Sequence, residues 1–129
     1  MSYDLSIFYS AHPMTAREAA QRYRALCERP LNTPGALEGL IEPDRRVGAF
    51  AAEMTALYPP LSLTSDDEDD LCPWSCDPDI SEGHVIVSVR WSRCQQMAQT
   101  LTEMAWRYDL IVYSPQDDKV YPPPAVPVP

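Results

Sequence analysis

Glycine is scarce in this sequence, because only four of the 129 residues are glycine. Phosphate-cradling loops are rich in glycine, and neither a P-loop nor a Gly-x-Gly-x-x-Gly pattern occurs. The His-Glu-x-x-His zinc motif and the Gly-x-Ser-x-Gly nucleophile elbow are also missing. We therefore expect a protein that is not an enzyme and that uses no cofactor and no bound metal.

Long apolar runs are missing as well. No stretch approaches the ~20 apolar residues that cross a bilayer, and the first residues show no secretory or transit signal. The four cysteines lack the spacing of a disulfide framework, which favours reduced thiols (Cys27, Cys72, Cys76 and Cys94). These features predict a cytoplasmic protein without membrane contact.

Lysine and arginine are absent between Val47 and Val89, although the chain has ten of them. The same segment contains nine acids: Glu53, Asp66, Asp67, Glu68, Asp69, Asp70, Asp77, Asp79 and Glu82. The other ten acids balance the ten cationic residues, so the whole net charge of −9 belongs to this segment. Nucleic acids and anionic lipids bind through cations and are repelled by such a segment. The charge favours a protein partner with a basic surface.

The first half of the chain predicts one strand and two helices. Residues 3–9 alternate between apolar and polar as a half-buried strand does, but Phe8 breaks the alternation, so we expect both faces to be covered near its end. A capping box at Thr15–Glu18 opens a helix that Pro30 stops. A second helix should run from the cap Asp44 to about Tyr58, before two prolines.

The second half predicts a strand, a helix and two short strands. Residues 84–91 form the strongest strand pattern, with Val85, Val87, Val89 and Trp91 on one face. Ser92 with Gln95 reads as another capping box, which opens a helix over 92–108. A core strand over 110–113 follows, and residues 119–121 could pair back with it as a hairpin.

This order predicts an α+β fold in a single domain over residues 1–121. The sheet should have roughly four strands, with about three helices packed mainly on one face. Strands 84–91 and 110–113 with the helix between them should form a right-handed βαβ unit. Residues 122–129 (Pro-Pro-Pro-Ala-Val-Pro-Val-Pro) should be an extended, proline-rich tail in the polyproline conformation.

Residues 61–82 show no periodicity beyond a possible short strand near Ile80, and they contain five consecutive acids. Such a block is either a solvated loop or a docking surface for a partner. Trp74 follows the block and could serve as an interface anchor or could fill the core and pin the loop. The predicted partner-binding residues are Asp66, Asp67, Glu68, Asp69, Asp70, Trp74, Asp77 and Asp79.

Metal binding is a weaker interpretation of the same stretch. Asp66, Glu68 and Asp70 alternate like the first ligands of an EF-hand loop. However, Leu71 stands where that loop needs glycine, and Asp77 stands where it needs a bidentate glutamate. The Cys72-x3-Cys76 spacing permits half of a zinc site with His84 and Cys94, but a second knuckle is missing.

Cys94 is the one candidate nucleophile. It lies near the start of its predicted helix and beside Arg93, and both features favour a thiolate. A nucleophile also needs a base, and the chain has only His12 and His84, which nothing in the sequence places beside Cys94. Its spacing with Met97 and Leu101 indicates a core residue instead.

Three motifs carry a resemblance to known proteins: Tyr3-Asp4-Leu5, the acidic run before Pro73-Trp74-Ser75, and Tyr113-Ser114-Pro115-Gln116 followed by Val120-Tyr121. With them the chain resembles small, mostly uncharacterised bacterial cytosolic proteins that are similar to immunity proteins, which block secreted toxins by direct binding. The resemblance covers nearly the whole chain and implies no catalytic residues. The chain departs from the pattern at Cys72 and Cys76, at Tyr108-Asp109, where a glycine often ends the helix, and in its proline tail.

The function expected from charge and resemblance is that of a non-enzymatic bacterial immunity protein. It would bind and neutralise a cognate secreted toxin through its acidic surface. The alternatives are a small cysteine- or metal-dependent enzyme and a housekeeping protein-binding adaptor.

Overall fold

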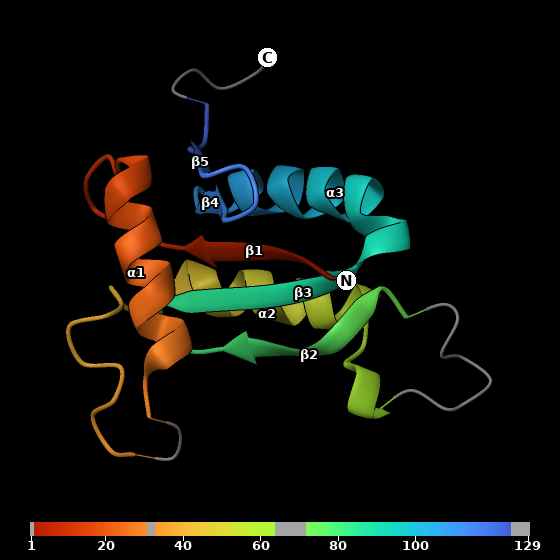
Figure 1. Ribbon diagram of the computed structural model, residues 1–129, viewed down its shortest axis with the longest axis horizontal. Helices are drawn as coiled ribbons and strands as arrows, with labels where there is room; N and C mark the ends of the chain where they lie inside the picture. The colour runs from red at the N-terminus through yellow and green to blue at the C-terminus, as the bar shows by residue number, and fades with distance from the viewer. Residues whose placement is uncertain (1, 31–32, 64–71, 125–129) are drawn as a thin grey trace.

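The computed structural model describes residues 2–30, 33–63 and 72–124 (Figure 1). In this part of the chain, five strands form one antiparallel sheet in the order β2-β3-β1-β4-β5. The strands are β1 (Ser2–Phe8), β2 (Trp74–Ile80), β3 (His84–Arg90), β4 (Ile111–Ser114) and β5 (Lys119–Tyr121). The helices are α1 (Ala16–Glu28), α2 (Arg45–Leu57) and α3 (Cys94–Arg107), with short 3-10 turns η1 (Leu61–Leu63) and η3 (Trp91–Arg93). The α+β class is confirmed.

The sheet has five strands where the sequence predicted about four, and β1 lies at its centre. Because β3 and β4 both pair antiparallel with β1, they run parallel to each other with β1 between them. The strands on either side of α3 are therefore parallel, as predicted. They are not adjacent, however, whereas the two strands of a simple βαβ unit lie side by side. The predicted hairpin is confirmed, because β4 pairs antiparallel with β5.

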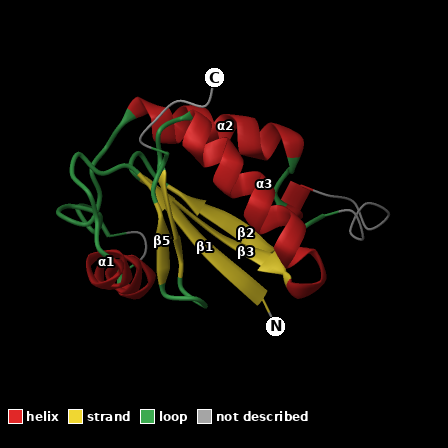
Figure 2. Cartoon of the chain, turned by 90° about the horizontal axis from the view of Figure 1, so that it is seen from above, coloured by secondary structure: helices red, strands yellow, loops and turns green. Residues whose placement is uncertain are grey.

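The helices cover both faces of the sheet (Figure 2). Helices α2 and α3 pack on the face that carries the main core, where Leu5 and Ile7 of β1 meet the valines of β3. Helix α1 lies on the opposite face and forms a smaller cluster with Phe8, Ile111 and Tyr113. Phe8 is buried under α1, which confirms that both faces are covered at the end of β1.

The helix starts show which capping predictions were right. Thr15 and Glu18 form the predicted capping box of α1, and Asp44 accepts a hydrogen bond from the backbone N–H of Arg46 at the start of α2. The predicted Ser92 cap is wrong, because η3 occupies these residues and α3 begins at Cys94 without a side-chain cap. The chain turns into η3 after Arg90, so Trp91 is 52% exposed instead of sharing the inner face of β3.

The stretch predicted as a loop with a short strand near Ile80 contains the seven-residue strand β2. It lies at the edge of the sheet, and its register with β3 shifts between Trp74 and Cys76 and again between Cys76 and Asp79. These irregularities and Pro78 removed the alternation that would have indicated a strand.

None of the helices in the described ranges is long and apolar enough to cross a membrane.

Candidate functional site

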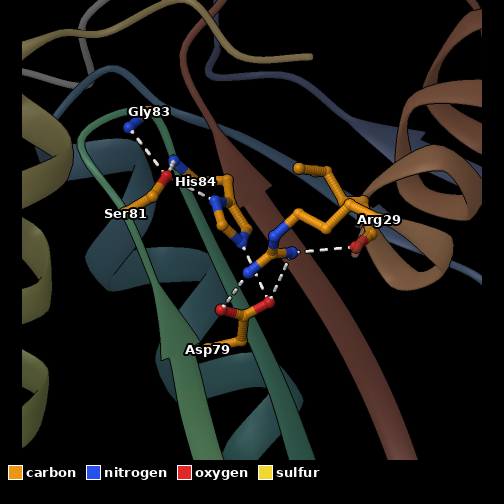
Figure 3. Close-up of polar contacts among 6 residues, drawn as sticks. Arg29, Asp79, Ser81, Gly83 and His84 are labelled. Atoms are coloured by element: carbon orange, nitrogen blue, oxygen red, sulfur yellow. Dashed lines mark hydrogen bonds and ion pairs between the residues drawn. The ribbon is translucent and has the colours of Figure 1, made fainter. Parts of the chain in front are cut away.

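A polar cluster joins the end of α1 to the turn between β2 and β3 (Figure 3). Its members are Arg29, Asp79, Ser81 and His84, and we call it the Arg29–Asp79 cluster. Arg29 is the C-cap of α1, Asp79 lies near the end of β2, and His84 begins β3. Pro30 ends α1 at this point and β2 ends one residue after Asp79, so the cluster forms where three elements meet.

Arg29 and Asp79 form a bidentate ion pair at the centre of the cluster. Arg29 Nη1 lies 2.9 Å from Asp79 Oδ2, and Nη2 lies 2.8 Å from Oδ1. Arg29 Nη1 also donates to the backbone carbonyl of Leu26 at 2.8 Å, so the guanidinium is held from both sides. Burial raises the pKa of Asp79, but hydrogen bonds from Arg29 and His84 outweigh it and leave the pKa below its ordinary value.

His84 is fully buried and bonded at both ring nitrogens. Its Nε2 lies 3.2 Å from Asp79 Oδ2, and its Nδ1 is hydrogen-bonded to the Ser81 hydroxyl. Burial lowers the pKa of His84, and the contact with Asp79 offsets only part of that effect. The imidazole is therefore neutral at neutral pH, and we assign its Nε2–H as the donor to Asp79 and the Ser81 hydroxyl as the donor to Nδ1.

Ser81 holds the turn between β2 and β3 in place. Its hydroxyl oxygen accepts hydrogen bonds from the backbone N–H groups of Gly83 and His84, both at 3.2 Å. The backbone N–H of Ser81 donates to the carbonyl of His84 at 2.9 Å. Ser81 also lines an open hollow of about 520 Å³ together with Ile41 and Ile80.

Ser81, His84 and Asp79 form a chain of hydrogen bonds like that of a hydrolase triad. In such a triad the serine oxygen is free to attack, and the histidine passes its proton to the substrate. Here the Ser81 oxygen already accepts two backbone N–H groups, the His84 ring is fully buried, and Arg29 compensates the Asp79 charge. The geometry therefore fits a structural role, in which the cluster holds α1, β2 and β3 together.

The turn also depends on Gly83, which is buried against the segment that precedes α2. A Cβ on Gly83 would lie 2.8 Å from Cβ of Ile41 and 3.0 Å from the carbonyl carbon and oxygen of Glu42. Backbone atoms cannot move aside as the end of a side chain can. A backbone hydrogen bond also joins this segment to the turn, because the N–H of Asp44 donates to the carbonyl of Glu82 at 3.1 Å.

We therefore expect Gly83→Ala to lower the free energy of unfolding by about 1–3 kcal/mol, as overpacking does in buried sites. Urea denaturation at pH 7 measures this change. Gly48→Ala is the matched control, because a Cβ on Gly48 in α2 would meet no atom within 4 Å. In a helix interior that substitution should stabilise by about 0.5–1 kcal/mol. Equal effects of the two substitutions would contradict the close approach at Gly83.

The predicted partner-binding residues fall into three groups. Asp66, Asp67, Glu68, Asp69 and Asp70 lie outside the described residues, and so does the calcium loop considered for them. Asp77 is exposed on the edge strand β2, where hydrogen bonds from Ser62 lower its pKa. Asp79 belongs to the Arg29–Asp79 cluster and so already has a cationic partner inside the chain.

Trp74 lies in the core. Its side chain is 0% exposed, its Nε1–H donates to the carbonyl of Tyr58 at 2.9 Å, and the two rings meet edge to face. Because it has no exposed surface, Trp74 cannot act as an interface anchor in this conformation. The other interpretation of this residue, a core tryptophan that fixes the chain beside it, fits the geometry.

The four cysteines carry free thiols, as expected. Cys94 is the first residue of α3 and is half-buried, whereas Cys72 is buried in the main core. Within residues 2–30, 33–63 and 72–124, no three His, Cys, Asp or Glu side chains come together in a way that could hold a metal ion. Cys72, Cys76, Cys94 and His84 therefore do not form the zinc set that their spacing permitted.

No known protein family, curated protein or solved structure matches this chain.

The sequence did not indicate Arg29 and Ser81 as members of the Arg29–Asp79 cluster. Arg29 lies 50 residues from Asp79, and no periodicity reports a contact over that distance. The Ser81–His84 turn did carry a signal, because serine and glycine between two apolar stretches are typical of a hairpin.

Proposed function

We propose that this chain is a non-enzymatic bacterial immunity protein that binds and neutralises a cognate secreted toxin domain. It would act in the bacterial cytoplasm, and its partner would present a basic surface. One observation carries the proposal: the entire net charge of −9 belongs to a single segment that contains no lysine or arginine. The resemblance of the chain to toxin-neutralising immunity proteins supports it.

Ion pairs of the described residues compensate two of the nine acids of this segment. Asp79 is compensated by Arg29, and Glu53 by Arg107. The remaining acids of the segment are the run 66–70 and the exposed Asp77 and Glu82. Charges of one sign gathered on a surface raise the association rate with an oppositely charged partner, by 10-fold to 1,000-fold in the usual range.

The edge strand β2 favours contact through side-chain charges. An exposed edge strand can add a strand from a partner, but bulges, proline and charged side chains oppose such pairing. β2 has two register shifts, Pro78 and the acids Asp77 and Asp79. We therefore assign the binding role to the carboxylates of 66–70 and Asp77. If the toxin acts on nucleic acid, these carboxylates would occupy its phosphate site.

To test the proposal, the secreted protein encoded by the neighbouring reading frame is expressed in bacteria, once alone and once together with this chain. Relief of growth arrest and co-purification are the expected results. Failure of both would overturn the proposal. Surface plasmon resonance then compares two triple variants with the same change of charge: Asp67→Asn, Glu68→Gln and Asp69→Asn in the run, and Glu28→Gln, Glu38→Gln and Glu103→Gln outside it.

At low salt, the first variant should associate about tenfold more slowly than the unmodified chain, and the second less than about twofold more slowly. At about 1 M salt, where the screening length is ~3 Å, the difference should vanish. Equal association rates for the two variants at low salt would remove the acidic run from the mechanism while leaving the binding function in place.

A further inference from the structure

An aromatic groove runs along α3 on the side of the sheet that carries the main core. Three half-buried rings line it: Tyr3 of β1, Trp106 of α3 and Tyr121 of β5. The lining is completed by Leu5, Ala98, Gln99, Thr102 and Glu103, and the groove has a volume of about 250 Å³. The 52% exposed Trp91 extends this aromatic surface, because its ring centroid lies 6.3 Å from that of Tyr3.

Two of the three rings of the groove, those of Trp106 and Tyr3, are held in place by hydrogen bonds. Trp106 Nε1–H donates to the carbonyl of Tyr121 at 3.1 Å. The Tyr3 hydroxyl is hydrogen-bonded to Ser114 Oγ at 3.1 Å and to Asp117 Oδ2 at 3.2 Å. A ligand that enters the groove therefore finds rings that are already ordered and loses little side-chain entropy on binding. Fixed tyrosine and tryptophan rings are the usual composition of binding hot spots.

Grooves lined by aromatic rings are the sites where proteins bind polyproline segments. Such a segment is already extended, so binding costs it little conformational entropy. This chain contains a segment of that kind in residues 122–129, five of which are proline and none of which is charged. Within it, Pro124-Ala125-Val126-Pro127 has the Pro-x-x-Pro spacing that such grooves bind.

The first residues of the proline segment, Pro122 and Pro123, lie away from the Tyr3 end of the groove. Tyr121 pairs with Val112, which pairs with Ile7, so the chain leaves β5 beside the last residues of β1. Pro122 and Pro123 then line a different hollow, beside Tyr9 and Pro13. The Tyr3 end of the groove, with Trp91, is at the other end of β1. Among residues 2–30, 33–63 and 72–124, this end of the groove is therefore open to another molecule.

We propose that the aromatic groove binds the proline-rich segment 122–129 of a second copy of this chain. Two copies related by a twofold axis would each supply one segment and one groove. Once the first segment is bound, the second contact forms within the same complex, which strengthens two weak contacts into a measurable association. This self-association uses a surface other than the acidic one and is independent of the toxin partner.

Sedimentation equilibrium of the full chain tests this inference. The mass should rise from 14.5 kDa toward that of a dimer between about 10 μM and about 1 mM, as expected of a small interface. A Pro124→Ala/Pro127→Ala variant and a Thr102→Arg variant, which fills the groove, should each stay monomeric over this range. The matched control is Leu57→Ala, which removes another exposed apolar side chain (58%) outside the groove and should still dimerise.

Mixing the two monomeric variants gives the sharper result. The Thr102→Arg chain has an intact proline segment, and the Pro124→Ala/Pro127→Ala chain has an intact groove, so together they should form a complex with one contact. That complex should dissociate at least about tenfold more readily than the unmodified dimer. A chain that stays monomeric at every concentration, or a proline variant that still dimerises, would overturn the inference. Unchanged thermal unfolding of the variants would show that they are folded.

Discussion

Replacement of Trp74 by alanine is expected to lower the free energy of unfolding by about 3–5 kcal/mol, the usual range for truncation of a buried aromatic side chain. Trp74 is among the largest fully buried side chains of the described residues, and it packs against Tyr58 with ring centroids 6.2 Å apart. Its loss would leave a cavity in the main core and an unpaired carbonyl on Tyr58. Urea denaturation at pH 7 measures the change.

Two variants separate the contributions to this loss. Trp74→Phe keeps most of the apolar contact but removes the Nε1–H donor to Tyr58, and should cost about 1–3 kcal/mol. Trp91→Ala removes the same kind of side chain from a position that is 52% exposed, and should cost less than about 1 kcal/mol. Comparable losses for Trp74→Ala and Trp91→Ala would contradict the placement of Trp74 in the core.

The sequence predicted most of the elements on the basis of local signals. The capping box at Thr15 and the cap at Asp44 marked helix starts that the structure confirms. Phe8 breaks the alternation of its strand because it packs beneath α1. This one residue therefore indicated that the sheet face opposite the main core is also covered. These signals succeed because each rests on residues that are neighbours in the chain or on one face of an element.

The sequence predicted only a possible short strand near Ile80 where the seven-residue β2 lies, because the pairing of β2 is not local. Two register shifts with β3 and a proline erase the period of two, and three successive residues, Ser75, Cys76 and Asp77, are exposed. Without β2, Trp74 falls in a predicted loop, where it is either a partner anchor or a core residue that pins the loop. Pairing of Trp74 with Val89 of β3 turns the ring into the core, and only the assembled sheet provides that constraint.

The turn before β5 shows the structural role of Gln116, which belongs to the Tyr113-Ser114-Pro115-Gln116 motif. The Gln116 side chain accepts a hydrogen bond from the backbone N–H of Asp4 and donates to its carbonyl at 2.8 Å. It thereby continues the pairing of β1 beyond the last residue of β4 at Ser114. The role of this glutamine is therefore structural. This motif therefore carries information on the fold.

Replacement of Arg29 by methionine should lower the free energy of unfolding by about 2–3 kcal/mol. Removal of one partner from a buried ion pair costs about 3–5 kcal/mol, and the smaller value allows for the 40% exposure of the Asp79 side chain. The Arg29 side chain is only 10% exposed, and its loss would leave Asp79 beside the buried His84 without a cation. Urea denaturation at pH 7 measures the change.

The Arg107–Glu53 pair is the control, since its N–O distance of 2.6 Å is shorter but the Arg107 side chain is 63% exposed. Arg107→Met should cost at most about 1 kcal/mol, because solvent screens an exposed pair. If distance decided the energy, Arg107→Met would cost more than Arg29→Met. The opposite order is expected, because burial of the guanidinium determines how strongly the charges interact.

A double-mutant cycle of Arg29→Met and Asp79→Asn isolates the interaction between the two side chains. The pair lowers the pKa of Asp79 in the folded chain, so its contribution is fully present above the ordinary value of 3.8. It is lost as the pH falls through the lower folded value and the carboxyl takes up a proton. The coupling energy should therefore stay constant from pH 8 to pH 5 and disappear only in stronger acid. A coupling that already fades near pH 6 would mean that protonation of His84, and not of Asp79, controls the cluster.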